Sequence, residues 1–158
     1  MIPILPHVSR TLVTVLQPED VFDRMRGATT RQLLTQNLAP EQVRFTGVVQ
    51  PERFAISMRV NRPNSFLPIV RGRIEATQSG CLIFMKATLF PSTRVYMVFW
   101  LLFVPVAGLI ASRQYDSLLL FVAALALDLA VLWIAWANFR IQFRLTMRTL
   151  DEVLNSAD

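Results

Sequence analysis

Two long apolar segments, separated by a four-residue loop, constrain this chain more than any other feature of its sequence. Residues 95–112 carry no charge, and residues 117–139 carry only one, Asp128. At about 1.5 Å per residue, a helix over the first segment is roughly 27 Å long, close to the thickness of the bilayer hydrocarbon. We therefore predict a transmembrane helical hairpin within residues 91–139, with spans at about 95–112 and 117–139.

Basic residues gather on one side of this hairpin, before the first segment and after the second. They are Arg71, Arg73, Lys86, Arg94, Arg140, Arg144 and Arg148. The loop carries only Arg113, beside Asp116. Because an excess of Lys and Arg marks the cytoplasmic side of a span, we expect the N- and C-termini in the cytoplasm. The same basic residues are candidate contacts for anionic lipid headgroups or for a partner protein.

Residues 1–90 predict a small cytoplasmic α+β domain. Residues 8–15 suit a strand, and Pro18 with two acids after it is typical of a helix start. That helix would run toward residues 33–34, with a break at Gly27. Apolar and polar residues then alternate with the period of a strand in four further segments, namely 43–50, 54–61, 66–76 and 81–90. We predict an antiparallel sheet with one helix covering a face.

Residues 140–158 follow the second span as an amphipathic tail. Its apolar residues fit a strand, but they also form a helical stripe, which consists of Phe139, Phe143, Met147, Leu150 and Leu154. No Gly or Pro interrupts the chain after residue 109, so we predict a helix that continues from the second span. This helix either packs on the sheet domain, which is the simpler interpretation, or lies along anionic headgroups.

The composition excludes several kinds of site. With one histidine, His7, and one cysteine, Cys81, the chain cannot build a His/Cys zinc site or an intrachain disulfide. Its five glycines match neither a dinucleotide fingerprint nor a phosphate loop. The net charge is +5, and the arginines are scattered through the first half of the chain and then cluster just outside the apolar segments. Membrane orientation explains this distribution better than a nucleic-acid groove, so we expect no nucleic-acid partner. We expect no cofactor, no metal and no enzymatic activity, with Cys81 in the core and His7 on the surface.

Asp128 is the most informative single residue, because a charge at the middle of a span costs about 3 kcal/mol or more. Three interpretations remain open. The carboxyl group pairs with a basic or polar group on another subunit, or it takes part in proton-linked chemistry. Alternatively, it is protonated and bonds within the hairpin to the Leu101 carbonyl, which Pro105 leaves without its helical partner.

A second candidate site is the segment Asn64, Ser65, Phe66, Leu67 and Pro68, where a loop enters a strand. The structural interpretation is a turn followed by a Phe anchor. The functional interpretation is a docking loop for a partner. Arg71, Arg73 and Lys86 form a further candidate, as a basic strand face toward headgroups or an acidic partner.

Residues 61–103 resemble a family of small uncharacterised bacterial membrane proteins. The matching blocks are Asn64-Ser65-Phe66-Leu67-Pro68, Gly72-Arg73-Ile74-Glu75, Gly80, Leu89-Phe90-Pro91 and Phe99-Trp100, in that order. The chain departs from the pattern at Pro63, Cys81 and Phe90, where the family favours arginine, another residue after the turn glycine, and histidine. The resemblance implies the same fold and two-span topology in a bacterial inner membrane, and it implies no activity.

These features together predict a non-catalytic structural or accessory subunit of a larger bacterial membrane complex, such as a respiratory or photosynthetic one. Its expected partners are other membrane subunits and the lipid bilayer. The alternative is a free-standing membrane-anchored module that binds lipid or a cytoplasmic ligand. That alternative predicts a concave basic pocket around Arg71, Arg73 and Lys86.

Overall fold

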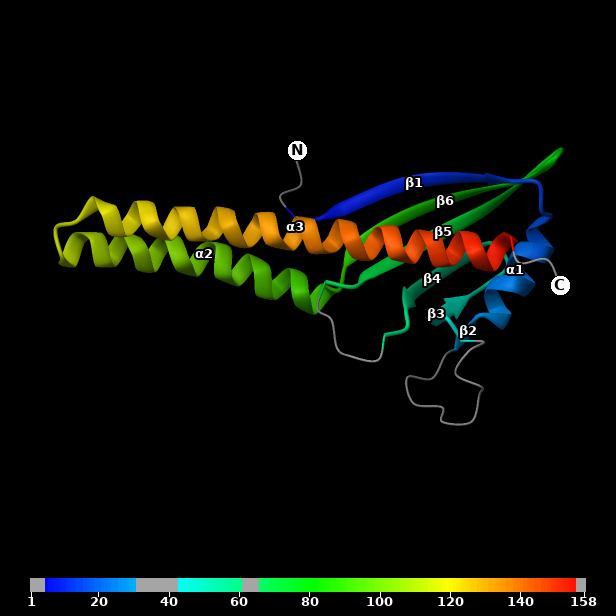
Figure 1. Ribbon diagram of the computed structural model, residues 1–158, viewed down its shortest axis with the longest axis horizontal. Coiled ribbons are helices and arrows are strands. Elements are labelled where there is room, and N and C mark those ends of the chain that lie inside the picture. Colours follow the sequence, from blue (N-terminus) through cyan, green and yellow to red (C-terminus); the bar gives the residue numbers. More distant parts are fainter. Residues whose placement is uncertain (1–4, 31–42, 61–65, 156–158) are drawn as a thin grey trace.

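The chain forms short strands and one helix before it enters two long helices. The computed structural model describes residues 5–30, 43–60 and 66–155. In chain order the elements are β1 (His7–Thr14), α1 (Pro18–Gly27), β2 (Thr29–Thr30), β3 (Phe45–Val49), β4 (Arg53–Met58), β5 (Pro68–Thr77), β6 (Gly80–Leu89), α2 (Pro91–Gln114) and α3 (Leu118–Asn155). This architecture confirms the predicted α+β fold with a helical hairpin (Figure 1).

The six strands form one sheet in the order β1-β6-β5-β4-β3-β2. All neighbouring strands are antiparallel except β2 and β3, which are parallel. The sheet is therefore mixed, whereas the sequence predicted a purely antiparallel one. The sequence does not reveal β2, because two residues are too short to show a period. The helix before it ends at Gly27, the expected break, and residues 33–34 lie outside the described part of the chain.

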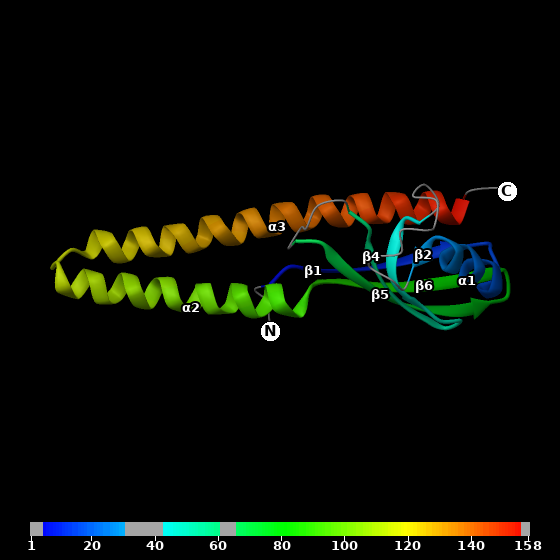
Figure 2. The same cartoon turned by 90° about the horizontal axis from the view of Figure 1, so that it is seen from below.

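One face of the sheet holds the core. Along β6 the side chains alternate, with Ile83 and Met85 buried and Phe84 and Lys86 exposed. Both α1 and α3 lie on the buried side of the sheet (Figure 2). Gly72 on β5 belongs to this packing, because a Cβ there would lie 2.1 Å from the ring of Phe54 on the neighbouring strand.

Helix α3 is continuous over 38 residues and joins the hairpin to the sheet. Its apolar stripe packs into the sheet core, so the simpler of the two interpretations of the tail is the arrangement found and the stripe does not lie along headgroups. The stripe comprises Phe139, Phe143, Met147, Leu150 and Leu154. All five side chains of the stripe are buried, and they belong to the same core cluster as the buried side chains of the strands.

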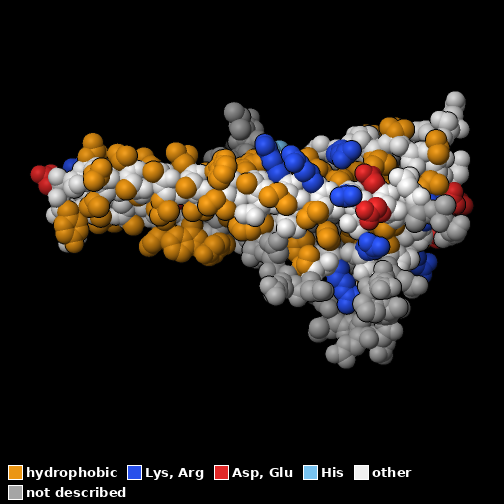
Figure 3. All heavy atoms as spheres, in the orientation of Figure 1, with side chains coloured by type: hydrophobic (Ala, Val, Ile, Leu, Met, Phe, Trp, Pro, Cys, Tyr) orange, Lys and Arg blue, Asp and Glu red, His pale blue; other side chains and the backbone are white. Residues whose placement is uncertain are grey.

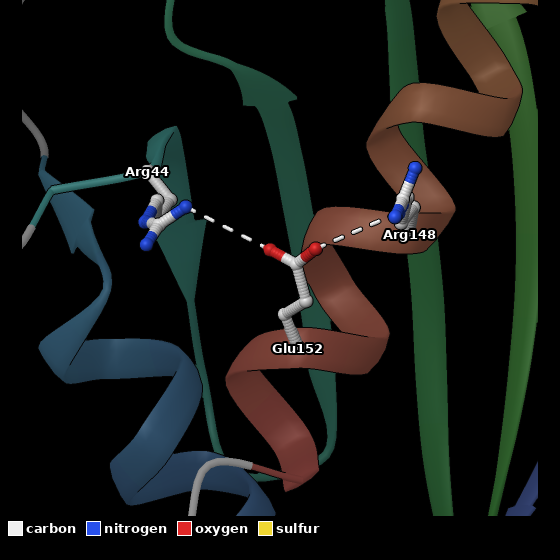
Figure 4. Close-up of polar contacts among 3 residues, drawn as sticks. All are labelled: Arg44, Arg148 and Glu152. Atoms are coloured by element: carbon white, nitrogen blue, oxygen red, sulfur yellow. Dashed lines mark ion pairs between the residues drawn. The ribbon is translucent and has the colours of Figure 1, made fainter.

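Polar contacts connect the far end of α3 to α1 and to the segment before β3. The Arg24 guanidinium of α1 donates a hydrogen bond of 2.7 Å to the Leu154 carbonyl. The Glu152 carboxylate lies 3.8 Å from Arg44, just before β3, and 3.7 Å from Arg148 one turn earlier in the helix (Figure 4). Because these three side chains are about half exposed or more, the ion pairs contribute little, about 0–1 kcal/mol each.

The hairpin points away from the sheet along the long axis of the molecule. In both views β5 and β6 run along the same axis as α2 and α3, with the helix loop at one end and the C-terminal part of α3 at the other (Figures 1 and 2). The sheet therefore extends the hairpin lengthwise.

Candidate functional site

The surface of the hairpin is apolar over most of its length. Both α2 and α3 are long and apolar enough to cross a membrane, and only 6% and 11% of their apolar windows are buried. Such low burial is not that of core helices in a soluble protein. Figure 3 shows hydrophobic side chains along the hairpin, with Lys and Arg side chains gathered where it meets the sheet domain. The arrangement suits a hairpin in lipid whose sheet domain lies in water.

The two helices approach each other most tightly near the loop. Leu101, Val104, Pro105 and Gly108 are half-buried and recur at helical spacing, so they form the side of α2 that faces α3. A Cβ on Gly108 would lie 2.5 Å from the Cβ of Ala124 on α3. The missing side chain at Gly108 thus allows close contact, as small residues do between membrane helices.

Toward the sheet the helices separate (Figures 1 and 2), and a cavity of about 700 Å³ opens between them. Its wall comes mainly from α2, with a contribution from α3 and from Phe66 before β5. The lining residues are Phe66, Ser92, Thr93, Tyr96, Met97, Trp100, Leu101, Val104, Leu127, Asp128, Val131 and Ala135.

Asp128 lines this cavity and is 8% exposed. Asp128 on α3 and Leu101 on α2 line the same cavity, and Pro105 lies on the side of α2 that faces α3. Among the described residues, however, the Asp128 carboxyl group has neither an ion pair nor a hydrogen bond, including one to the Leu101 carbonyl. Within the hairpin, the only carboxylate near the middle of a span is thus buried and faces an open cavity.

A second concave region lies on the sheet face opposite α3, which we call the outward face. Arg71 pairs with Lys86 in register, and Arg73 pairs with Phe84. These four residues line a shallow hollow of about 420 Å³. Arg73 lies 3.3 Å from Glu75, and Arg53 of β4, which pairs with Arg73 in register, extends the basic face. The predicted basic strand face is therefore present, and it is concave.

The predicted docking loop is only partly described. Asn64 and Ser65 lie outside the described residues. Leu67 and Pro68 are buried in the sheet domain, so their side chains are not accessible to a partner. Phe66 lines the cavity between the helices. This distribution fits the anchor interpretation of the segment.

The remaining basic candidates lie along the junction of hairpin and sheet. Arg94 is half-buried in the first turn of α2, and Arg140 and Arg144 are exposed on α3. The Arg140 guanidinium lies 5.6 Å from the centre of the Trp136 ring, a cation–π distance. Arg148 pairs with Glu152 instead of remaining a free headgroup contact.

The predicted core position of Cys81 agrees with the structure, whereas the predicted surface position of His7 does not. Cys81 is buried in the core, as predicted, and burial raises the pKa of its thiol. His7 is half-buried, with its ring 6.3 Å from that of Trp136 and its Nδ1 3.3 Å from the Leu5 carbonyl oxygen. In the described part of the chain no three His, Cys, Asp or Glu side chains gather in a way that could hold a metal ion.

Sequence reasoning missed most of the cavity wall. Thr93, Tyr96, Met97 and Trp100 recur three or four residues apart, which marks one side of a helix. That signal is hidden because nearly every residue of the span is apolar, so periodicity does not distinguish the lining side from the lipid side.

Comparison with known proteins adds little. No family model matches the chain, and no curated protein matches it. A solved structure, that of protein NE0264 from Nitrosomonas europaea, is 16% identical and covers 59% of this chain and 81% of its own. The TM-score is 0.34, too low to support an argument about fold or function.

Proposed function

We propose that this chain is a non-catalytic structural or accessory subunit of a larger bacterial membrane complex. The hairpin would cross the inner membrane, with both termini and the sheet in the cytoplasm, because the basic residues lie on that side of the spans. A respiratory or photosynthetic complex is one kind of host that would use such a subunit. Its role would be to hold membrane and cytoplasmic subunits in a fixed relation.

The observation that carries this proposal is the continuity of α3. One helix of 38 residues forms the second span and then lies in the core of the sheet domain. The hairpin and the sheet are therefore joined by one continuous hydrogen-bonded helix instead of a flexible linker. A rigid connection of this kind suits a subunit that holds its neighbours in a fixed arrangement. A membrane-anchored binding module, in contrast, functions equally well on a flexible linker.

Co-purification from native membranes tests the proposal. We expect mild-detergent extraction and affinity capture of the wild type to recover a defined set of other polypeptides. Arg144→Pro should kink α3 within the stripe that packs on the sheet, between Phe143 and Met147, because Pro removes a helical N–H and clashes with the preceding turn. This variant should lose part of the set, whereas the matched Arg144→Ala variant, which keeps the helix, should retain it.

A second candidate function is a free-standing membrane-anchored module that binds lipid or a cytoplasmic ligand. The concave basic outward face favours it. Lys86 lies five residues from Pro91, about 17 Å along an extended strand, whereas the headgroup layer is only about 5–8 Å deep. The face would therefore bind a soluble anionic ligand better than headgroups. Recovery of the wild type alone, or only with copies of itself, would contradict the subunit proposal and support this one.

A further inference from the structure

The cavity between α2 and α3 has the chemistry of a binding site for a charged partner within the membrane. We propose that one transmembrane helix of another subunit docks along its mouth, with a Lys or Arg side chain of that helix inside the cavity and paired to Asp128. This inference rests on the proposed function, because it names the kind of segment that the subunit would bind.

The carboxyl group points to a cationic occupant. Asp128 is more than nine-tenths buried, lines the cavity, and has no hydrogen bond or ion pair with any described residue. Ionisable groups inside a membrane pair with one another and face a bundle interior or a cavity rather than lipid. Asp128 already faces a cavity, and what it lacks is the opposite charge.

The length of the cavity suits a helix that lies along its mouth and places one side chain inside. Its lining on α2 extends from Ser92 to Val104, about 18 Å at 1.5 Å per residue. That length matches about three turns of a packed helix. Beyond Ser92, Thr93 and Tyr96 the side chains along it are apolar, so they would pack against the apolar side of a partner span, with Asp128 at the deep end for a single specific pair.

A second copy of this chain does not meet the requirement. Residues 95–112 and 117–139 contain no Lys, Arg or His, so another copy of the hairpin brings no cation to the depth of Asp128. Two copies that met at this cavity would instead bring two carboxyl groups together. A lipid acyl chain would fill the apolar wall but would leave the carboxyl group without a partner.

Long basic side chains can satisfy this geometry from within a span. Lys and Arg extend an apolar stem along neighbouring residues and place the charged head several ångströms from their own helix. A partner helix whose backbone lies at the cavity mouth could therefore reach Asp128, while its stem contacts Leu101 and Leu127 on the two walls.

Site-specific photocrosslinking in native membranes tests this inference. A photoreactive residue at Leu127, which lines the cavity and is 56% exposed, should crosslink to another polypeptide. The same residue at Leu129, 68% exposed and outside the cavity lining, serves as the matched control and should give at least tenfold less of that product. Mass spectrometry of the product should identify an apolar segment that contains Lys or Arg.

Variants at Asp128 connect the crosslink to the charge. Asp128→Leu should lower the crosslink from Leu127 at least tenfold, Asp128→Asn should lower it less, and Asp128→Glu should retain most of it. Circular dichroism of each purified variant checks that the helices still form. Asp128→Asn is nearly isosteric, so it keeps the test decisive if Asp128→Leu fails to fold.

Several outcomes would overturn the inference. These are a crosslink only to lipid, a crosslink to a second copy, a partner segment without a basic residue, or a crosslink that Asp128→Leu and Asp128→Asn leave unchanged. If other subunits co-purify but no crosslink forms from Leu127, the cavity inference fails while the subunit proposal stands. If nothing co-purifies, both fail.

Discussion

Leu150 provides a direct test of how α3 joins the hairpin to the sheet. Its side chain is fully buried in the core shared by α3 and the strands. Leu150→Ala removes three carbon atoms from a packed site, and such truncations cost about 2–5 kcal/mol. Leu145 lies on the same helix but is 43% exposed, so Leu145→Ala should cost about 1 kcal/mol or less. The expected difference of at least about 1 kcal/mol is roughly a fivefold change or more in an equilibrium constant.

The single cysteine makes this difference measurable. Cys81 belongs to the same buried core, so a thiol reagent reaches it only when the sheet domain opens. In detergent-solubilised protein, Leu150→Ala should speed the alkylation of Cys81 at least about fivefold relative to Leu145→Ala, where opening is fast compared with labelling. Equal rates for the two variants would refute the reasoning, because they would mean that the stripe on α3 is not docked on the sheet.

Two further predictions concern the helix contact and the cysteine. Gly108→Leu should force α2 and α3 apart, because even a Cβ there would lie 2.5 Å from Ala124 Cβ, and it should lower the midpoint of thermal unfolding in detergent. Ala124→Gly should partly restore the midpoint, and an unchanged midpoint in Gly108→Leu would disprove the contact. Because burial raises the pKa of the Cys81 thiol, the unfolded chain deprotonates first as the pH rises, so the free energy of unfolding should fall above pH 9.0. Cys81→Ala should lack that part of the decrease in urea titrations, and identical pH profiles would contradict it.

The parts of the fold that were predictable from the sequence depend on local patterns. A long segment without charged residues indicates a membrane span, whatever elements surround it in the fold. Alternation of apolar and polar residues along β5 and β6 places Arg71 and Lys86 on one face before any strand pairing is known. The stripe on residues 139–154 was ambiguous between strand and helix because both periods fitted. The structure resolves it as a helix, which buries the stripe against the sheet.

The parts that were not predictable depend on how elements meet. The β2–β3 pair joins two segments across residues 31–42, and a two-residue strand has no period of its own. The cavity wall depends on the rotation of α2 about its axis, which a uniformly apolar sequence does not reveal. For Asp128 the sequence predicted the depth and the neighbouring Leu101. It could not show that the helices separate there and leave the carboxyl group facing open space.

The unbroken α3 also makes the sheet sensitive to bilayer thickness. A span that is longer than the local hydrocarbon adapts by tilting. From Asp128 to Asn155 the helix is about 40 Å long at 1.5 Å per residue, so a tilt of about 10° about the middle of the span would displace its far end sideways, parallel to the membrane plane, by roughly 7 Å. In a membrane, the sheet would therefore act as the long arm of a lever, and its lateral position relative to the hairpin loop would report the thickness of the lipid around the hairpin.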